Sequence, residues 1–239
     1  MRVCYTSANS CAIYVTPSHQ YPLAVTMTLR RRQALLAWAE RNDAAIIEDD
    51  YDSEFRFGDR PLEPLKALDS TGRVIYVGSF SKTLSPSLRL GFLVVPGSLQ
   101  SAVRKAKFVS DWHTLTLAQT ALAYFIDDSG FARHLRRANR IYHERHDMLI
   151  EAVSHDFADH LELMPSTTGL HIAALARTAS VRRIADVTHR AAGADVEIQA
   201  LSQFAVRGIE RAGIVLGFGA IQTALIGDGL RRLRKCFDK

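Results

Sequence analysis

Two short apolar runs in this chain each stop at a cluster of polar side chains. The first, Ile46–Ile47, is followed directly by the acidic stretch Glu48–Asp52. The second, Val74–Val77, leads into a loop with four polar residues of interest: Ser79, Ser81, Lys82 and Arg89. Apolar, partly β-branched runs that end in this way are typical of buried strands in an α/β sheet, which deliver chemistry at their carboxyl ends. The two segments therefore predict a functional site at one edge of a sheet.

The side chains in these segments match the chemical needs of pyridoxal 5′-phosphate. Its aldehyde requires a lysine for a Schiff base, its ring nitrogen requires an acid, and its phosphate requires hydroxyls and an arginine. The amine of Lys82, one carboxylate of Glu48–Asp52, the hydroxyls of Ser79 and Ser81 and the guanidinium of Arg89 supply this set. The separation of Asp49 from Lys82 also leaves room for one crossover between neighbouring parallel strands.

Less specific interpretations of the same residues stay open at this point. Lysines are usually solvated surface groups. The carboxylates of Glu48–Asp52 could cap a helix or bind Mg²⁺ or Ca²⁺, although Tyr51 and Arg56 fit a metal site poorly. The loop serines could make turn hydrogen bonds only, which we expect for Ser85 and Ser87. The histidines and cysteines lack metal-ligand spacing, and we assign no metal.

Hydrophobic periodicity predicts strands that alternate with helices, and hence a layered α/β sheet with parallel pairing. Expected strands are 12–15, 45–48, 74–77, 90–95, 169–175, 196–200 and 214–218. Expected helices are 26–42, a short one around Leu65, 98–112, 116–127, 131–157, 181–192 and 221–237. Ser129-Gly130 separates two of these helices, so we place a domain boundary there, between residues 1–128 and 129–239.

Bulk properties exclude few classes of protein. The 239 residues carry a net charge of +5, and no apolar run reaches the length of a membrane span. The amino terminus lacks a secretory signal, so we expect a cytoplasmic location. Part of the positive charge lies on one predicted helix, and we interpret it as a solvated face or an anion cradle in preference to a nucleic-acid contact. These arginines are Arg133, Arg136, Arg137, Arg140 and Arg145.

Several segments resemble the aminotransferase-like region of MocR-type regulators, a GntR subfamily. They are Thr16–Pro22 (TPSHQYP), Arg31–Ala39, Ile47–Arg56 (IEDDYDSEFR) and Ser79–Lys82 (SFSK). The resemblance runs from about residue 12 to the end of the chain. It implies part of the type I fold of pyridoxal-phosphate-dependent aminotransferases, an α/β fold with a parallel-rich sheet. Residues 1–128 would be the later part of its large cofactor-binding domain, and 129–239 its small C-terminal α+β domain.

The resemblance also implies roles for individual residues. Lys82 would carry the cofactor as a Schiff base, Asp49 would pair with the pyridine nitrogen, and Tyr51 would bond the phenolate oxygen; these three are the candidate catalytic residues. Ser79, Ser81 and Arg89 would hold the phosphate. His19 and Gln20, in the turn-rich segment, are candidates to reach the cofactor ring or the substrate. An arginine for the substrate carboxylate is either absent or supplied by Arg207 or Arg211.

The resemblance favours an effector domain that senses a small amino compound through the cofactor aldimine. Members of the family begin with a DNA-binding winged helix and the first part of the aminotransferase region, and we expect this chain to lack both. DNA binding would then belong to that missing domain, and the intact protein would be a homodimer. The alternatives are a class I/II aminotransferase that uses Lys82 as its base, and a non-functional fragment. We expect little transaminase activity from this length of chain.

Overall fold

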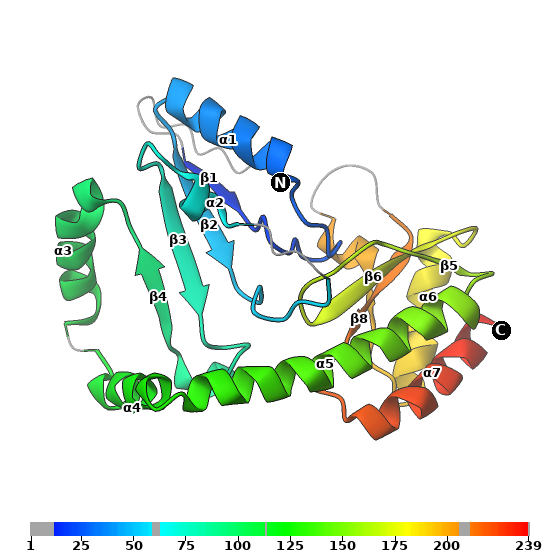
Figure 1. The fold of residues 1–239 in the computed structure, drawn as a ribbon. Coiled ribbons are helices and arrows are strands. Elements are labelled where there is room, and N and C mark those ends of the chain that lie inside the picture. The colour runs from blue at the N-terminus through cyan, green and yellow to red at the C-terminus, as the bar shows by residue number, and fades with distance from the viewer. Residues whose placement is uncertain (1–11, 59–62, 113, 206–210, 239) are drawn as a thin grey trace. The chain divides into compact units, whose positions relative to one another are not determined.

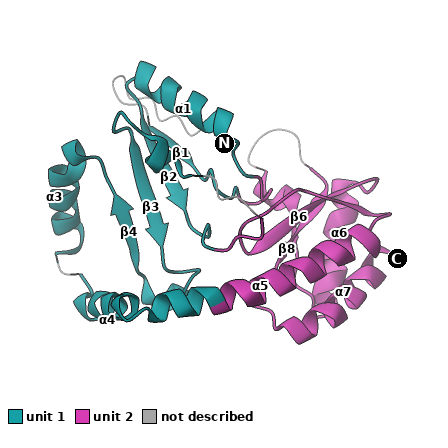
Figure 2. Ribbon diagram, viewed as in Figure 1, with its two compact units in different colours: residues 1–20, 26–54, 59–136 teal, residues 21–25, 55–58, 137–239 magenta. Residues whose placement is uncertain are grey.

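The computed structural model describes residues 12–58, 63–112, 114–205 and 211–238. They form two compact units, coloured separately in Figure 2. Unit 1 contains residues up to Gln20, Thr26–Glu54 and the stretch from residue 59 to Arg136; unit 2 contains Tyr21–Val25, Phe55–Gly58 and Arg137 onward. The helix α5 (Gly130–His155) contributes its first turns to unit 1 and the rest to unit 2. The predicted domain boundary at residue 128 lies just before this helix.

Unit 1 is built on a four-stranded sheet in the order β1-β2-β3-β4. The strands are β1 (Ala12–Val15), β2 (Ala45–Asp50), β3 (Val74–Ser79) and β4 (Gly91–Val94). β1, β2 and β3 are parallel, with Ile47 opposite Tyr14 on one side and opposite Ile75 on the other. This parallel core confirms the predicted α/β class, and β2 and β3 point the same way in Figure 1.

β4 corrects the expectation of parallel pairing, because it runs antiparallel to β3 with Val77 opposite Leu93 and Ser79 opposite Gly91. A parallel return requires a crossover of a dozen or more residues, usually a helix. The chain between Ser79 and Gly91 holds only a turn and a single 3₁₀ turn, η1 (Pro86–Leu88), so an antiparallel return is the accessible one. Phe92 packs over Gly78, where any larger side chain would collide with its ring.

One face of this sheet is covered by α1 (Leu29–Arg41) and the short α2 (Leu65–Leu68). The small core between them is apolar and fully buried: Ala39, Ala44, Ile46, Leu65 and Val74. Two charged residues are buried beside it. Arg32 donates to the carbonyl oxygens of Pro17 (2.8 Å), Met27 (3.0 Å) and Glu63 (3.0 Å), and Glu48 lies 3.9 Å from it. Buried ions persist only when they are paired and hydrogen-bonded in this way.

The carboxyl-terminal part of unit 1 consists of η2 (Gly97–Leu99), α3 (Gln100–Asp111) and α4 (Thr116–Asp127). Neither α3 nor α4 buries any of its residues. Their apolar side chains, among them Val109 and Leu117, lie on the surface.

Unit 2 has an antiparallel sheet in the order β5-β6-β8-β7. Its strands are β5 (Leu161–Leu163), β6 (His171–Ala176), β7 (Gln199–Ala200) and β8 (Gly213–Gly217). The later part of α5, α6 (Val181–Gly193) and α7 (Thr223–Phe237) pack on it, and η3 (Leu201–Phe204) follows β7. β5 was not predicted, and only the last two residues of the expected strand 196–200 form β7. The predicted α+β character of this part is confirmed.

Candidate functional site

The carboxyl ends of β2 and β3 place the two predicted clusters at one edge of the sheet. Asp49 lies opposite Val77 and Asp50 opposite Gly78, so the acidic stretch of β2 lies beside the last residues of β3. Ser79 ends β3, and Ser81 and Lys82 follow in the next turn. Neighbouring parallel strands thus place Asp49, Ser79 and the turn that carries Lys82 at the same edge of the sheet.

The acidic residues of β2 differ in burial, because alternate side chains of a strand point to opposite faces of the sheet. Glu48 and Asp50 are buried on the face covered by α1 and α2. The carboxylate of Glu48 accepts hydrogen bonds from the backbone N–H groups of Leu65 and Lys66, both at 2.8 Å, and so caps the start of α2. Asp50 accepts from the hydroxyls of Ser53 (2.6 Å) and Tyr76 (2.7 Å). Both carboxylates therefore have structural partners.

Asp49 lies on the other face of the sheet and is only half-buried. It accepts a hydrogen bond from the hydroxyl of Tyr14 on β1. Burial, together with the hydrogen bond to Asp49 and the charge of that carboxylate, raises the pKa of Tyr14 to about 12. Sequence reasoning missed Tyr14. No motif marks it, and only the pairing of β1 with β2 brings its ring next to Asp49.

Tyr51, His19 and Gln20 lie in the loops that follow β2 and β1. The hydroxyl of Tyr51 donates to the carbonyl oxygen of His19 at 2.9 Å. His19 is buried, and its Nδ1 lies 2.8 Å from a carboxylate oxygen of Asp52. Gln20 is exposed. The structure thus brings Tyr51 and His19 together and gives Asp52 a partner, so that Asp52, like Glu48 and Asp50, is engaged within the protein.

The loop after β3 holds the remaining candidates. The Oγ of Ser79 accepts a hydrogen bond from the backbone N–H of Ser81 at 3.1 Å, which closes the turn before Lys82. Lys82 is exposed, and within the described part of the chain its amine forms no hydrogen bond or ion pair. Arg89 is also exposed and adopts a left-handed backbone conformation (φ 50°) after η1. Ser85 accepts from the N–H of Ser87, the turn bond that the sequence predicted for this pair.

This donor set fits pyridoxal phosphate chemically. It offers an uncommitted amine on Lys82, a half-buried carboxylate on Asp49, two hydroxyls and an exposed guanidinium on one sheet edge and its loops. The other candidates for the acid, Glu48 and Asp50, lie on the opposite face and are occupied by other groups.

Two arginine predictions concern unit 2. Arg207 lies outside the described residues, and Arg211 is exposed just before β8. In the arginine-rich helix α5, Arg145 is bound internally, because its guanidinium donates to the carbonyl oxygens of Phe218 (3.1 Å) and Gly219 (3.0 Å). That arginine is therefore unavailable to nucleic acid.

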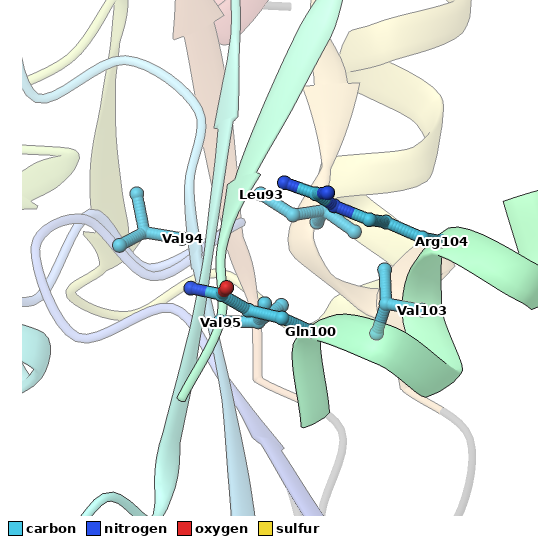
Figure 3. A pocket seen from close by; sticks show the side chains of 6 residues that line it. All are labelled: Leu93, Val94, Val95, Gln100, Val103 and Arg104. Atoms are coloured by element: carbon cyan, nitrogen blue, oxygen red, sulfur yellow. The ribbon is translucent and has the colours of Figure 1, made fainter. Parts of the chain in front are cut away.

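A separate hollow of about 340 Å³ lies between β4 and α3 in unit 1 (Figure 3). Its lining is mostly apolar: Leu93, Val94, Val95, Gln100, Val103 and Arg104. It shares no residue with the candidate site.

Across the described ranges, the helices are all too short or too polar to cross a bilayer.

Comparison with known proteins shows that the chain is similar to transcriptional regulators. No protein-family model matches the chain. It is 40% identical over 227 residues to the probable rhizopine catabolism regulatory protein MocR of Rhizobium meliloti, covering 94% of this chain and 45% of that protein. It is 35% identical over 226 residues to the uncharacterized HTH-type transcriptional regulator YhdI of Bacillus subtilis, covering 95% and 48%. The chain thus spans about half the length of these curated relatives.

Solved structures of similar fold include aminotransferases. The kynurenine aminotransferase of Pyrococcus horikoshii, determined with PMP, superposes with a TM-score of 0.85 at 27% identity, covering 95% of this chain and 56% of that one. LysN, the α-aminoadipate aminotransferase of Thermus thermophilus, was determined with N-(5′-phosphopyridoxyl)-L-leucine. It gives 0.82 at 26% identity, covering 94% and 58%. Both likenesses extend over nearly all of this chain.

Proposed function

We propose that this chain, which corresponds to the aminotransferase-like region of the MocR-type transcriptional regulators, binds pyridoxal 5′-phosphate and uses it to sense a small amino compound. The observation that carries the proposal is the placement of Asp49 and Lys82 at the carboxyl ends of two neighbouring parallel strands. Lys82 offers an unpaired amine there, and Asp49 offers the one half-buried carboxylate of the acidic stretch Glu48–Asp52 that faces away from the core.

Each candidate residue has a distinct task in this proposal. Lys82 would hold the cofactor by condensation of its amine with the aldehyde, which releases water, and Asp49 would hold a proton on the ring nitrogen. The hydroxyl of Tyr51, which donates its one proton to the carbonyl oxygen of His19 in this structure, would turn to donate to the phenolic oxygen of the cofactor. Phosphate binding falls to the hydroxyls of Ser79 and Ser81 and the guanidinium of Arg89, whose planar fork suits phosphate oxygens. When bound, the cofactor supplies an electron sink for carbon atoms attached to the amino group of a ligand.

His19 and Gln20 complete the proposed set from the loop after β1. Before the cofactor binds, the carbonyl oxygen of His19 accepts the hydrogen bond of Tyr51, so His19 holds that hydroxyl next to the loop after β1. Gln20 is exposed and able to reach a ligand. The proposal includes a homodimer and a cytoplasmic location for the intact protein, with DNA contacted through a separate domain.

A direct test of the proposal is covalent capture of the cofactor. We expect borohydride reduction after addition of pyridoxal phosphate to leave a pyridoxyl mass on the peptide that contains Lys82. The variant Lys82→Arg should lose the label and the visible absorption band, whereas Lys105→Arg, which changes another exposed lysine, should retain both. A label on other lysines in the wild-type chain, with none on Lys82, would overturn the assignment.

A catalytic aminotransferase is the second candidate function, favoured by the likeness to the two aminotransferase structures. The two functions differ in product. A sensor changes its visible spectrum with an amino compound and releases the compound unchanged, whereas an aminotransferase releases a keto acid. Incubation of the loaded chain with a panel of amino acids, followed by keto-acid analysis, distinguishes them. A chain that neither binds the cofactor nor folds cooperatively would be the non-functional fragment.

A further inference from the structure

Tyr14 contacts Asp49 from the neighbouring strand of the same sheet. In the parallel ladder, Tyr14 lies opposite Ile47, two residues before Asp49, so all three side chains point to the same face. The phenol donates its hydrogen bond to one carboxylate oxygen of Asp49, Oδ2. A carboxylate has two oxygens with room for several donors, so Oδ1 remains able to accept from a second donor.

We propose that Tyr14 is a positioning residue for the cofactor: by holding Oδ2 it turns the carboxylate of Asp49 so that the second oxygen faces the ring nitrogen. This inference rests on the proposed function and assigns a role to a residue outside every motif of the chain. A carboxylate at the end of a strand can otherwise rotate about its side-chain bonds. A fixed donor removes that freedom and preorganises the acid.

The electrostatics of Tyr14 suit a permanent donor. Burial and the contact with Asp49 raise its pKa to about 12, so the phenol keeps its proton at neutral pH and continues to donate. The phenol of Tyr14 is therefore a neutral donor to the carboxylate, and Tyr14 adds no charge to the site.

A second tyrosine provides a matched control within the same sheet. Tyr76 on β3 donates to Asp50 at 2.7 Å, on the face covered by α1 and α2. Both tyrosines thus bind an aspartate of β2 from an adjacent strand, but only Tyr14 does so on the face of the proposed site. Tyr14→Phe and Tyr76→Phe remove equivalent hydroxyls from opposite faces.

The hydrogen bond is tested first without cofactor. In ¹³C-NMR titration of chain labelled at tyrosine Cζ, the signal absent from Tyr14→Phe identifies Tyr14. We expect Asp49→Asn to lower the pKa of Tyr14 part of the way from about 12 toward its ordinary value of 10.0: burial, the largest cause, remains, but the hydrogen bond to the Asp49 carboxylate and the charge of that carboxylate are lost. We expect Asp50→Asn to leave that signal unchanged. A pKa of Tyr14 that is the same in Asp49→Asn and in wild type would overturn the proposal.

The positioning role is tested next with cofactor. We expect Tyr14→Phe to weaken pyridoxal phosphate binding about 3- to 10-fold, a modest loss for a partly exposed charge-assisted hydrogen bond, and to shift the pH profile of the visible band. Tyr76→Phe should bind with wild-type affinity and the wild-type pH profile, although its stability falls. Equal affinity and equal pH profiles for Tyr14→Phe and wild type would overturn the inference and leave the proposed function standing. A wild-type chain that binds no cofactor through Lys82 would overturn both.

Discussion

At the scale of single residues, strand alternation gives the carboxylates between Glu48 and Asp52 different surroundings. The sequence places an acid at this sheet edge but leaves open whether it is Glu48, Asp49 or Asp50. The structure surrounds Glu48 and Asp50 with donors from the protein, whereas Asp49 is half-buried and, within the described ranges, has Tyr14 as its one side-chain donor. The distinction depends on which alternate residues of β2 face the covering helices, and the acidic stretch alone does not show this.

The role of Asp49 is tested with a pair of isosteric variants. In the proposed site, Asp49→Asn would remove the charge that keeps the cofactor ring nitrogen protonated, so we expect the reaction of the loaded chain with amino compounds to slow on the order of 10²-fold or more. Asp50→Asn should leave that rate unchanged but lower the free energy of unfolding by about 1–3 kcal/mol, because it disturbs a buried hydrogen-bond network. Stopped-flow spectroscopy and urea unfolding measure the two effects. An unchanged rate in Asp49→Asn would move the role to another carboxylate.

At the scale of elements, most helices and strands follow from periodicity, and the exceptions have local causes. The parallel ladder of β1, β2 and β3 was predicted from the alternation of strands with helices. The predicted direction of β4 was wrong, although the connection from Ser79 to Gly91 is too short for a parallel return and so indicates an antiparallel strand. The helix expected from Thr26 begins only at Leu29, since Thr26 and Met27 bond instead to the loop at Pro17–Ser18. Such tertiary contacts are not visible in a local pattern.

The link between Glu48 and α2 gives a prediction with a defined pH dependence. Burial raises the pKa of Glu48 above its ordinary value of 4.5, against the opposing effect of its hydrogen bonds from Lys66 and Leu65. The folded chain therefore holds this proton more tightly than the unfolded chain. The resulting stabilisation is fully present below pH 4.5 and is lost as pH rises through the raised pKa.

Glu48→Gln cannot titrate and leaves one backbone N–H of α2 without a good acceptor. We expect the variant to be less stable than wild type by about 1–3 kcal/mol below pH 4.5. The difference should narrow as pH rises, because only the wild-type chain loses the stabilisation of the bound proton. Urea unfolding at a series of pH values measures this difference. A gap that is constant or widens with pH would contradict the assigned direction of the Glu48 pKa.

At the scale of the whole molecule, unit 1 exposes many large apolar side chains on its carboxyl-terminal helices. Val109 is 83% exposed, Leu117 80%, Tyr124 72% and Trp112 70%. The neighbouring edge strand β4 is exposed at every residue. Isolated exposed apolar residues are ordinary, but a concentration of them on α3, α4 and an edge strand is typical of a surface that is covered by another polypeptide.

This surface predicts that the purified chain self-associates. We expect sedimentation velocity over a series of concentrations to show oligomers that persist at high salt, because removal of apolar area from water drives the contact and charge screening does not weaken it. The double variant Val109→Lys/Leu117→Lys should shift the chain toward monomer with an unchanged circular dichroism spectrum. Leu225→Lys, which places the same charge at a 54% exposed leucine of α7, should associate like wild type. A wild-type chain that is monomeric at every concentration would show that the exposed apolar side chains of α3 and α4 do not drive self-association. Equal association of the double variant and wild type would place the contact elsewhere.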